Sequence, residues 1–397
     1  MKKWMLRWRG WQVVACLSVA VALLLTGVTA TVQATVRKSI PTSSAEGSDH
    51  ASQKPELPVV RAANAFLATL SPAEKEKILV PFTKENAIRW SNLPCGTYCR
   101  GGIEFKDLTP EQIAAAKNVV RVALNTSKGV GYDQVMQVVA ADDVLQYSQT
   151  TGAGGAAPPK APPAGSKPPA GMDPNAGPLA YGSKLYTLVF VGAPSSTGTW
   201  ELHFGGHHVA VNLTYHNGKL TGESPFFIGV EPSWWKAKNG ETYSPLATMR
   251  SSLKAAINSL APFQLSRAKL PVSFTDVYLG PGKDGQFPKK KSGIPLTELL
   301  PYQRDLVVKA IEQWVSVADK KSAARLLNIY KSELNQTYLA YSHGTSLTQH
   351  GDYIRIDGPS VWIEFVCQQG VVFNKRIHYH TIYRDHLRDY GGELHFS

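Results

Sequence analysis

Cysteine is scarce in this chain: the 397 residues include only four. A zinc knuckle needs two cysteine pairs, and only one pair, in the stretch "CGTYC", is present. Three residues separate Cys95 from Cys99, one more than in a redox C-x-x-C motif. We therefore predict a short local disulfide between Cys95 and Cys99, formed in an oxidising compartment. Cys367 stands alone in an apolar segment and is expected to be a buried small side chain.

Three further patterns are missing after the N-terminal leader. No later segment is apolar for long enough to span a membrane. No basic helix interleaved with aromatic residues occurs, so we expect no nucleic-acid partner despite the formal net charge of +12. That charge indicates solubility and loose attraction to anionic surfaces. The absence of a G-x-S-x-G motif argues against a serine hydrolase with a nucleophile elbow.

Residues 1–34 have the layout of a secretory signal peptide. Four basic residues among the first nine precede an apolar stretch, and Val32 and Ala34 supply the small residues of a cleavage site. An uncleaved membrane anchor is the alternative, because the apolar stretch is nearly long enough to span a bilayer. Cleavage predicts a secreted or periplasmic protein. Residues 35–60 have no periodicity and few large apolar side chains, so we expect them to form a flexible tether.

Residues 61–397 are long enough for one large domain or two smaller ones. The same start signal predicts two helices, because "SPAE" at Ser71 and "TPEQ" at Thr109 both indicate capping boxes. Residues 149–178 are almost entirely Gly, Ala and Pro and cannot bury a core. This segment either separates two domains or forms a long surface insertion within one.

The remaining sequence combines strand and helix patterns. Together they predict an α+β fold with a largely antiparallel β-sheet flanked by helices. The dipeptide Asn217-Gly218 is a strong hairpin signal. The predicted strands are 184–192, 200–215 and 226–230, the predicted helices are 132–146, 246–260, 302–318 and 320–335, and a closing β unit runs through "DYIRIDG", "VWIEFVC" and "KRIHYHTIY".

The histidines are concentrated in two segments, "WELHFGGHHVAVNLTYHNG" and "RIHYHTIYRDHLRDYGG". His378 and His380 are two residues apart, so both side chains lie on one face of a strand. A third imidazole from another strand would complete a metal site, and His208 is the best candidate because its strand face is small and polar. His207 is expected on the opposite, apolar face, either as a core imidazole or as a supporting imidazole, and it is counted with the residues of the metal site. A bulge at Gly205-Gly206 would instead bring His203 into the site.

Other polar residues are assigned supporting roles. Glu364, in the strand before the terminal hairpin, is a candidate fourth ligand or general base, with Glu231 as a weaker candidate. Arg384 is expected to clamp an anionic group of a small-molecule or polymer substrate. Three residues are predicted to hydrogen-bond to the ligand histidines and orient them: Asn212, Asp385 and Asp389. For Asp389 the alternative is a salt bridge that stabilises its loop.

Several motifs taken together resemble the bacterial family catalogued as domain of unknown function 3500, over about residues 61–392. The resemblance implies a single domain with an insertion at 149–178, and it implies no activity. The family tends to have proline after the Arg-Asp pair, where this chain has His386. The motifs are "W-x-L-x-F-x-G-H-H" (200–208), "N-L-T" (212–214), "P-F-F-I-G-V-E-P" (225–232), "Y-I-R-I-D-G-P-S-V-W-I-E-F" (353–365), "H-Y-H-T-I-Y-R-D" (378–385) and "D-Y-G" (389–391), and they contain His207, His208, His378, His380, Arg384 and Asp389.

Three functional hypotheses follow from these patterns. The first is an exported metal-dependent hydrolase that uses a divalent ion, with zinc favoured, to activate water. The second is a copper oxidoreductase on the same ligands, because ligand type alone does not separate the two metals. The third is a non-catalytic envelope binding protein with structural histidines. A cupin is excluded because no glutamate follows the H-x-H at the required place, and the oligomeric state is left open.

Overall fold

The computed structural model describes residues 57–153, 155 and 180–396. All of them belong to one compact unit, Lys54–Ser397. The predicted signal peptide, nearly all of the predicted tether and most of the 149–178 segment lie outside the described residues. Among the described helices, none combines the length and the apolar character needed to cross a bilayer.

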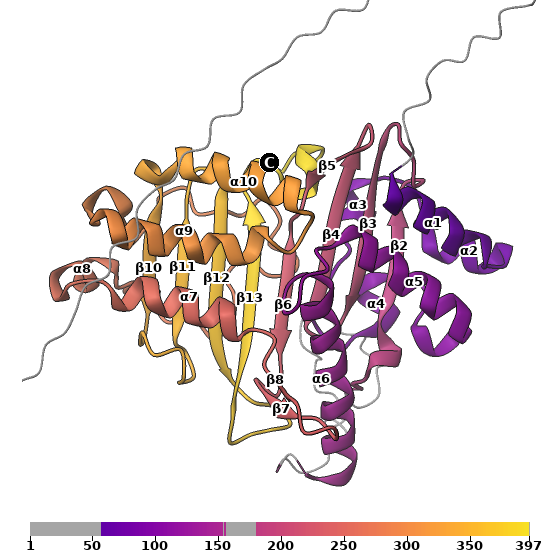
Figure 1. Cartoon of the computed structure of the whole chain (residues 1–397), viewed down its shortest axis with the longest axis horizontal. Coiled ribbons are helices and arrows are strands. Elements are labelled where there is room, and N and C mark those ends of the chain that lie inside the picture. Colours follow the sequence, from indigo (N-terminus) through magenta and orange to yellow (C-terminus); the bar gives the residue numbers. More distant parts are fainter. Residues whose placement is uncertain (1–56, 154, 156–179, 397) are drawn as a thin grey trace, which may run out of the picture. The chain divides into compact units, whose positions relative to one another are not determined.

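A large, mostly antiparallel β-sheet organises the described part of the chain (Figure 1). Its strand order is β1-β2-β3-β4-β6-β13-β12-β11-β10-β9, and β5 pairs with β4 outside this path. Two short strands, β7 (Trp235–Lys236) and β8 (Thr242–Tyr243), form a separate ribbon. The sheet strands are β1 (Leu79–Val80), β2 (Thr187–Val191), β3 (Thr199–Gly206), β4 (Val209–His216), β5 (Lys219–Gly222), β6 (Phe226–Val230), β9 (Ile294–Pro295), β10 (Tyr338–Ser342), β11 (Tyr353–Asp357), β12 (Val361–Gln369) and β13 (Ile377–Asp385).

Helices cover one face of this sheet (Figure 1), so the predicted α+β class is confirmed. Side chains alternate along each strand, and the apolar set, which includes Phe204, Val211 and Phe365, packs against the helices. Loops and short elements cover the second face around Trp90 and Tyr390. The helices are α1 (Pro58–Ala68), α2 (Pro72–Ile78), α3 (Lys84–Ala87), α4 (Gly96–Arg100), α5 (Pro110–Ala123), α6 (Tyr132–Thr151), α7 (Ala247–Asn258), α8 (Pro262–Ala268), α9 (Pro301–Val315) and α10 (Lys320–Ser332).

The elements on the two sides of the Gly/Ala/Pro-rich segment pack into one fold. Strand β1 precedes the segment and pairs in parallel with β2, which follows it. Helix α6 also precedes the segment and contacts β4 and β6. The segment is therefore an insertion within one domain rather than a linker between two. Both predicted capping boxes are present, at Ser71 of α2 and Thr109 of α5.

The predicted strand 200–215 is wrong, because it is a hairpin. Strands β3 and β4 pair antiparallel with Gly206 opposite Val209, so His207 and His208 form a two-residue turn. The pairing is regular through Gly205 and Gly206, and the predicted bulge is absent there. The adjacent histidines are thus freed from the strand alternation that would have sent them to opposite faces.

Glu223, in the connection from β5 to β6, is a buried carboxyl whose titration is expected to affect stability. It is 5 % exposed, and both carboxyl oxygens lack a hydrogen-bond partner among the described residues. Burial, followed by repulsion from Asp319, raises the pKa of Glu223 well above the ordinary value of 4.5; Arg325 opposes the shift, and Asp385 adds to it. The unfolded chain therefore ionises at lower pH than the folded one, and stability falls as pH rises above about 4.5.

We expect Glu223→Gln to remove this dependence. The variant's stability advantage over the wild type should be smallest near pH 4.5 and grow by up to about 1.4 kcal/mol per pH unit above it. Urea unfolding at several pH values measures the difference. An advantage that stays constant between pH 5 and 8 would contradict the assignment.

Candidate metal centre

The turn between β3 and β4 presents His208 from a strained backbone position. Its φ is 63°, in the left-handed region that residues other than glycine rarely occupy. Two hydrogen bonds hold this backbone: His208 N donates to Asn92 O at 2.9 Å, and Gly229 N donates to His208 O at 2.7 Å. An unfavourable backbone held in place by its surroundings is typical of a functional position.

Strand β13 supplies two more imidazoles from one face, as the H-x-H spacing predicts. His380 lies opposite Gly229 of the neighbouring strand β6. A Cβ atom on Gly229 would stand 2.8 Å from the His380 ring and 2.9 Å from the His208 ring. Because Gly229 has no Cβ, the rings of His380 and His208 can both lie directly over strand β6.

These three histidines form a buried cluster. Each offers a ligand nitrogen, and the three nitrogens lie within 4.8 Å of one another. The ring centroid of His208 is 5.5 Å from that of His378 and 5.0 Å from that of His380, and the latter two are 4.9 Å apart. The residues are 2 %, 3 % and 6 % exposed in that order. Zinc–nitrogen bonds of 2.0–2.1 Å imply nitrogens about 3.3 Å apart, so small ring movements would close the site on an ion.

The nitrogens of this cluster are available for an ion. Among the described residues, His378 Nδ1 and His380 Nε2 are buried without a hydrogen-bond partner. Burial, followed by the neighbouring imidazoles, lowers the pKa of both His208 and His378 well below 6.5. Both rings are therefore neutral near pH 7, which is the form that binds a metal.

One cluster histidine has a carboxylate on its second ring nitrogen, and another has a carboxylate near the nitrogen that is without a partner. Asp276, in the loop after α8, is 2.8 Å from His380 Nδ1, which leaves Nε2 for an ion. Glu231 Oε2 is 3.9 Å from His378 Nδ1, beyond hydrogen-bonding distance. A carboxylate on the second nitrogen fixes the ring orientation and tautomer of a ligand histidine and raises its basicity.

His207 joins the same region from the helix side. Its ring lies against that of His208, with centroids 3.6 Å apart, and its Nδ1 is 2.8 Å from Asp142 of α6. Tyr186 OH donates to His207 O at 2.6 Å. Asp142, His207 and His208 form a second group whose potential ligand atoms lie within 4.8 Å of one another. In this group Asp142 and His207 are already hydrogen-bonded to each other.

Residues 52–392 match the family described as "Protein of unknown function (DUF3500)". The chain belongs to this family. The match includes both histidine segments and the Gly/Ala/Pro-rich insertion, which confirms the resemblance drawn from the motifs. No curated protein and no solved structure matches the chain.

Glu364 of this DUF3500 domain is buried within a complete hydrogen-bond shell. Its carboxylate accepts from the backbone N–H groups of Tyr278 (2.5 Å) and Leu279 (2.9 Å), from Tyr353 OH (2.8 Å) and from Trp362 Nε1 (2.7 Å). Burial raises its pKa, although these four donors act in the opposite direction. Four donors occupy the lone pairs that a general base or metal ligand would use. The geometry thus favours a structural role.

Arg384 is likewise engaged inside the DUF3500 fold. Its guanidinium donates to Asp389 at 2.8 Å, to Asp284 at 2.5 Å and to Leu279 O at 3.2 Å, and the residue is 0 % exposed. The two carboxylates raise its pKa further, against the effect of burial. A buried cation with these partners holds the terminal segment to the sheet, and this geometry favours a structural role over a substrate clamp.

The residues predicted to support the histidines have other partners. Asp385 accepts from Tyr330 OH at 2.6 Å, and Asp389 pairs with Arg384. Asn212 donates to Pro225 O at 2.7 Å. Glu231, the weaker sequence candidate, lies near His378 and accepts from Val372 N and Phe373 N. Asp276 and Asp142 also contact the histidine region, and they belong to segments that carry no histidine and no motif, so only spatial proximity reveals them.

The remaining sequence candidates lie apart from the cluster. The sulfur atoms of Cys95 and Cys99 are at disulfide distance, with Cα atoms 5.9 Å apart, and Cys367 is buried. His203 Nε2 is 3.2 Å from Glu201, and His386 Nε2 is 3.4 Å from Asp357. Neither His203 nor His386 belongs to a donor group of the described residues.

Asp276→Asn is expected to weaken metal binding through His380 rather than by removing a ligand. An amide can present either its oxygen or its NH₂ to Nδ1, so it no longer fixes the tautomer. We expect the zinc dissociation constant to rise about tenfold, measured by competition with a chelator. Asp305→Asn, on α9 and away from the cluster, is the matched control. Equal affinities of the two variants would show that Asp276 does not act on the ligand.

Proposed function

We propose that this protein is an exported metalloprotein that binds one divalent transition metal ion through His208, His378 and His380. Zinc is the favoured ion. The observation that carries the proposal is the meeting of three buried imidazoles from segments about 170 residues apart, two of which have a ring nitrogen without a hydrogen-bond partner among the described residues. Imidazole nitrogens are ligands that zinc and copper take in proteins, and His380 has the carboxylate partner on its second nitrogen that is typical of such ligands.

The same geometry supports hydrolysis as the reaction. Three protein ligands leave a coordination position open, and a zinc ion in such a site lowers the pKa of bound water to near 7. In this chain Asp276 orients His380. The His208 ring packs against the His207 ring on one side and occupies the space that the missing Cβ of Gly229 leaves on the other. Burial of all three rings excludes bulk water and strengthens their electrostatic effect on a bound group.

Metal content is the first test. The purified protein, stripped with a chelator and titrated with zinc chloride, should bind one equivalent, and elemental analysis of the protein as isolated should find the resident ion. A visible absorption band and a paramagnetic signal would instead support the copper oxidoreductase. Binding of neither zinc nor copper by the folded chain would end the proposal and favour structural histidines.

Hydrolysis requires its own test. The zinc-loaded protein should cleave at least one member of a panel of chromogenic esters, phosphate esters and peptides. Chelation should abolish the activity and zinc should restore it, while His380→Ala should stay inactive. Activity that is equal in the wild type and His380→Ala would contradict metal-dependent hydrolysis, even if zinc binds.

Export is supported by the leader sequence and by the Cys95–Cys99 pair. The protein expressed from its full gene in a bacterium should appear in the periplasm or medium, with an N-terminus at Thr35. A product that retains Met1 in the cytoplasm would contradict this part of the proposal.

A further inference from the structure

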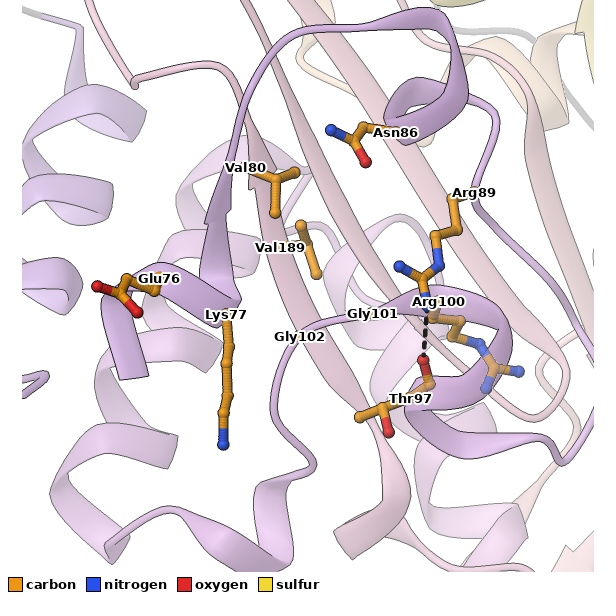
Figure 2. Close-up of a pocket in the computed structure, with 10 residues that line it drawn as sticks. All are labelled: Glu76, Lys77, Val80, Asn86, Arg89, Thr97, Arg100, Gly101, Gly102 and Val189. Carbon is orange, nitrogen blue, oxygen red and sulfur yellow. Dashed lines mark hydrogen bonds between the residues drawn. The ribbon is translucent and has the colours of Figure 1, made fainter. Parts of the chain in front are cut away.

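The loop that contains the cysteine pair lies against the end of strand β3. It runs from Ser91 to Arg100 and includes the short helix α4. A surface pocket of about 350 Å³ opens on its outer side, where Arg89 donates to the backbone oxygen of Thr97 at 3.4 Å (Figure 2). Arg89 also donates to Tyr98 O at 3.1 Å. One side of the loop is thus near solvent, and the other side meets the histidine turn.

Arg100 connects this loop to the turn. Its Nε donates to Ser91 O at 2.9 Å and its Nη1 to Gly96 O at 3.2 Å. Its Nη2 donates to Leu93 O and, at 2.8 Å, to Gly206 O. Gly206 is the residue directly before His207 and His208. One guanidinium therefore binds three carbonyls of the loop and the carbonyl at which the turn begins.

The burial of Arg100 needs an explanation. The residue is 5 % exposed, and among the described residues no carboxylate lies within ion-pair distance of it. Burial lowers its pKa to about 10, so the group is still a cation at neutral pH. Asp142 and Glu104 favour the cation from beyond ion-pair distance, and its direct partners are all backbone carbonyls. A buried charge with such partners is unfavourable unless their geometry is well matched. The guanidinium offers five N–H donors in a fixed plane, whereas a lysine ammonium offers three.

The loop also contacts the turn at a second point. His208 N donates to Asn92 O, so the loop binds the backbone on both sides of His207. His208 has φ 63°, a conformation that relaxes readily in a residue other than glycine when nothing holds it. The disulfide between Cys95 and Cys99 lies in the loop between Asn92 and Arg100, which make these contacts, and it limits the freedom of the residues that join them.

We propose that Arg100 is the positioning residue of the metal centre, and that the loop 91–100, which contains the Cys95–Cys99 disulfide, holds the His208 ring on the ion. This inference rests on the proposed zinc site at His208, His378 and His380. Its consequence is that zinc affinity depends on the Cys95–Cys99 bond, although neither cysteine is a ligand. Metal retention is thereby linked to the oxidising compartment in which the bond forms.

Two variants test this role: Arg100→Met and the double variant Cys95→Ser/Cys99→Ser. The zinc dissociation constant of each should rise at least tenfold, as measured by chelator competition on the full mature chain. Their cobalt complexes should show altered visible bands, because one imidazole is no longer held on the ion. Leu326→Ala, in the core of α10 and 2 % exposed, is the control for loss of stability alone. It should bind zinc like the wild type and keep the wild-type cobalt bands.

Wild-type affinity and wild-type cobalt bands in either test variant would overturn the inference. The inference also fails if Leu326→Ala loses as much affinity as Arg100→Met, because the effect would then be general destabilisation. If Arg100→Met does not fold, the double cysteine variant decides alone. A wild-type protein that binds no zinc is a different result, and it refutes the proposed function itself.

Discussion

Replacing His380 by alanine is expected to lower zinc affinity by about 10²- to 10³-fold. Structural zinc sites with four ligands have binding free energies of about 10–16 kcal/mol, so one ligand contributes roughly 3–4 kcal/mol. Isothermal titration with zinc chloride measures the change.

His216→Ala is the control for this variant. His216 ends strand β4, is 42 % exposed and contacts Thr199 and Glu393 instead of the cluster. It should bind zinc with wild-type affinity. If His380→Ala and His216→Ala bind zinc equally well, the ligand assignment fails. Circular dichroism of both variants establishes that the fold is intact.

Gly229→Ala is expected to remove zinc binding without touching a ligand. The new methyl group would stand 2.8 Å from the His380 ring, 2.9 Å from the His208 ring and 2.9 Å from Tyr379 O. These distances are shorter than carbon contacts allow, so the rings must separate. We expect zinc affinity to fall by about 10²-fold or more and the free energy of unfolding to drop by about 1–3 kcal/mol.

Gly280→Ala provides the comparison for the added methyl group. A Cβ there meets Val277 at an ordinary 3.4 Å, and its backbone does not have a positive φ. Stability and zinc affinity should both stay close to the wild type. Tight zinc binding by Gly229→Ala would show that the rings do not meet over β6, which would contradict the cluster geometry.

The fold class followed from the sequence because its signals are local. Each signal involves only residues that are close together in the sequence. The capping boxes at Ser71 and Thr109 and the Asn217-Gly218 turn are of this kind, and all three appear in the structure. The 200–215 hairpin was misassigned as one strand although the sequence contains its signal. Leu202 and Phe204 occupy even positions, whereas Val209 and Val211 occupy odd ones, and this change of phase marks a turn.

The pairing of His378 with His380 followed from spacing, whereas the position of His208 and the supporting groups of the cluster did not. His208 was expected on a polar strand face and lies in a turn. His378 and His380 share a face because strand side chains alternate, which is a local rule. Asp276 and Asp142 reach the site through the packing of a loop and a helix that begin far away in the sequence. Conversely, Glu364 and Arg384 stand in suggestive motifs, yet their partners come from the distant segment around Leu279 and Asp284. Partners of this kind are set by tertiary packing alone.

The central claim is that three imidazoles bind one ion, and anomalous diffraction at the zinc edge tests it most directly. Crystals of the zinc-loaded protein should show one strong anomalous peak within about 2.0–2.1 Å of a ring nitrogen of each of His208, His378 and His380. A map with no peak among these rings, or with its only peak elsewhere on the chain, would contradict the claim.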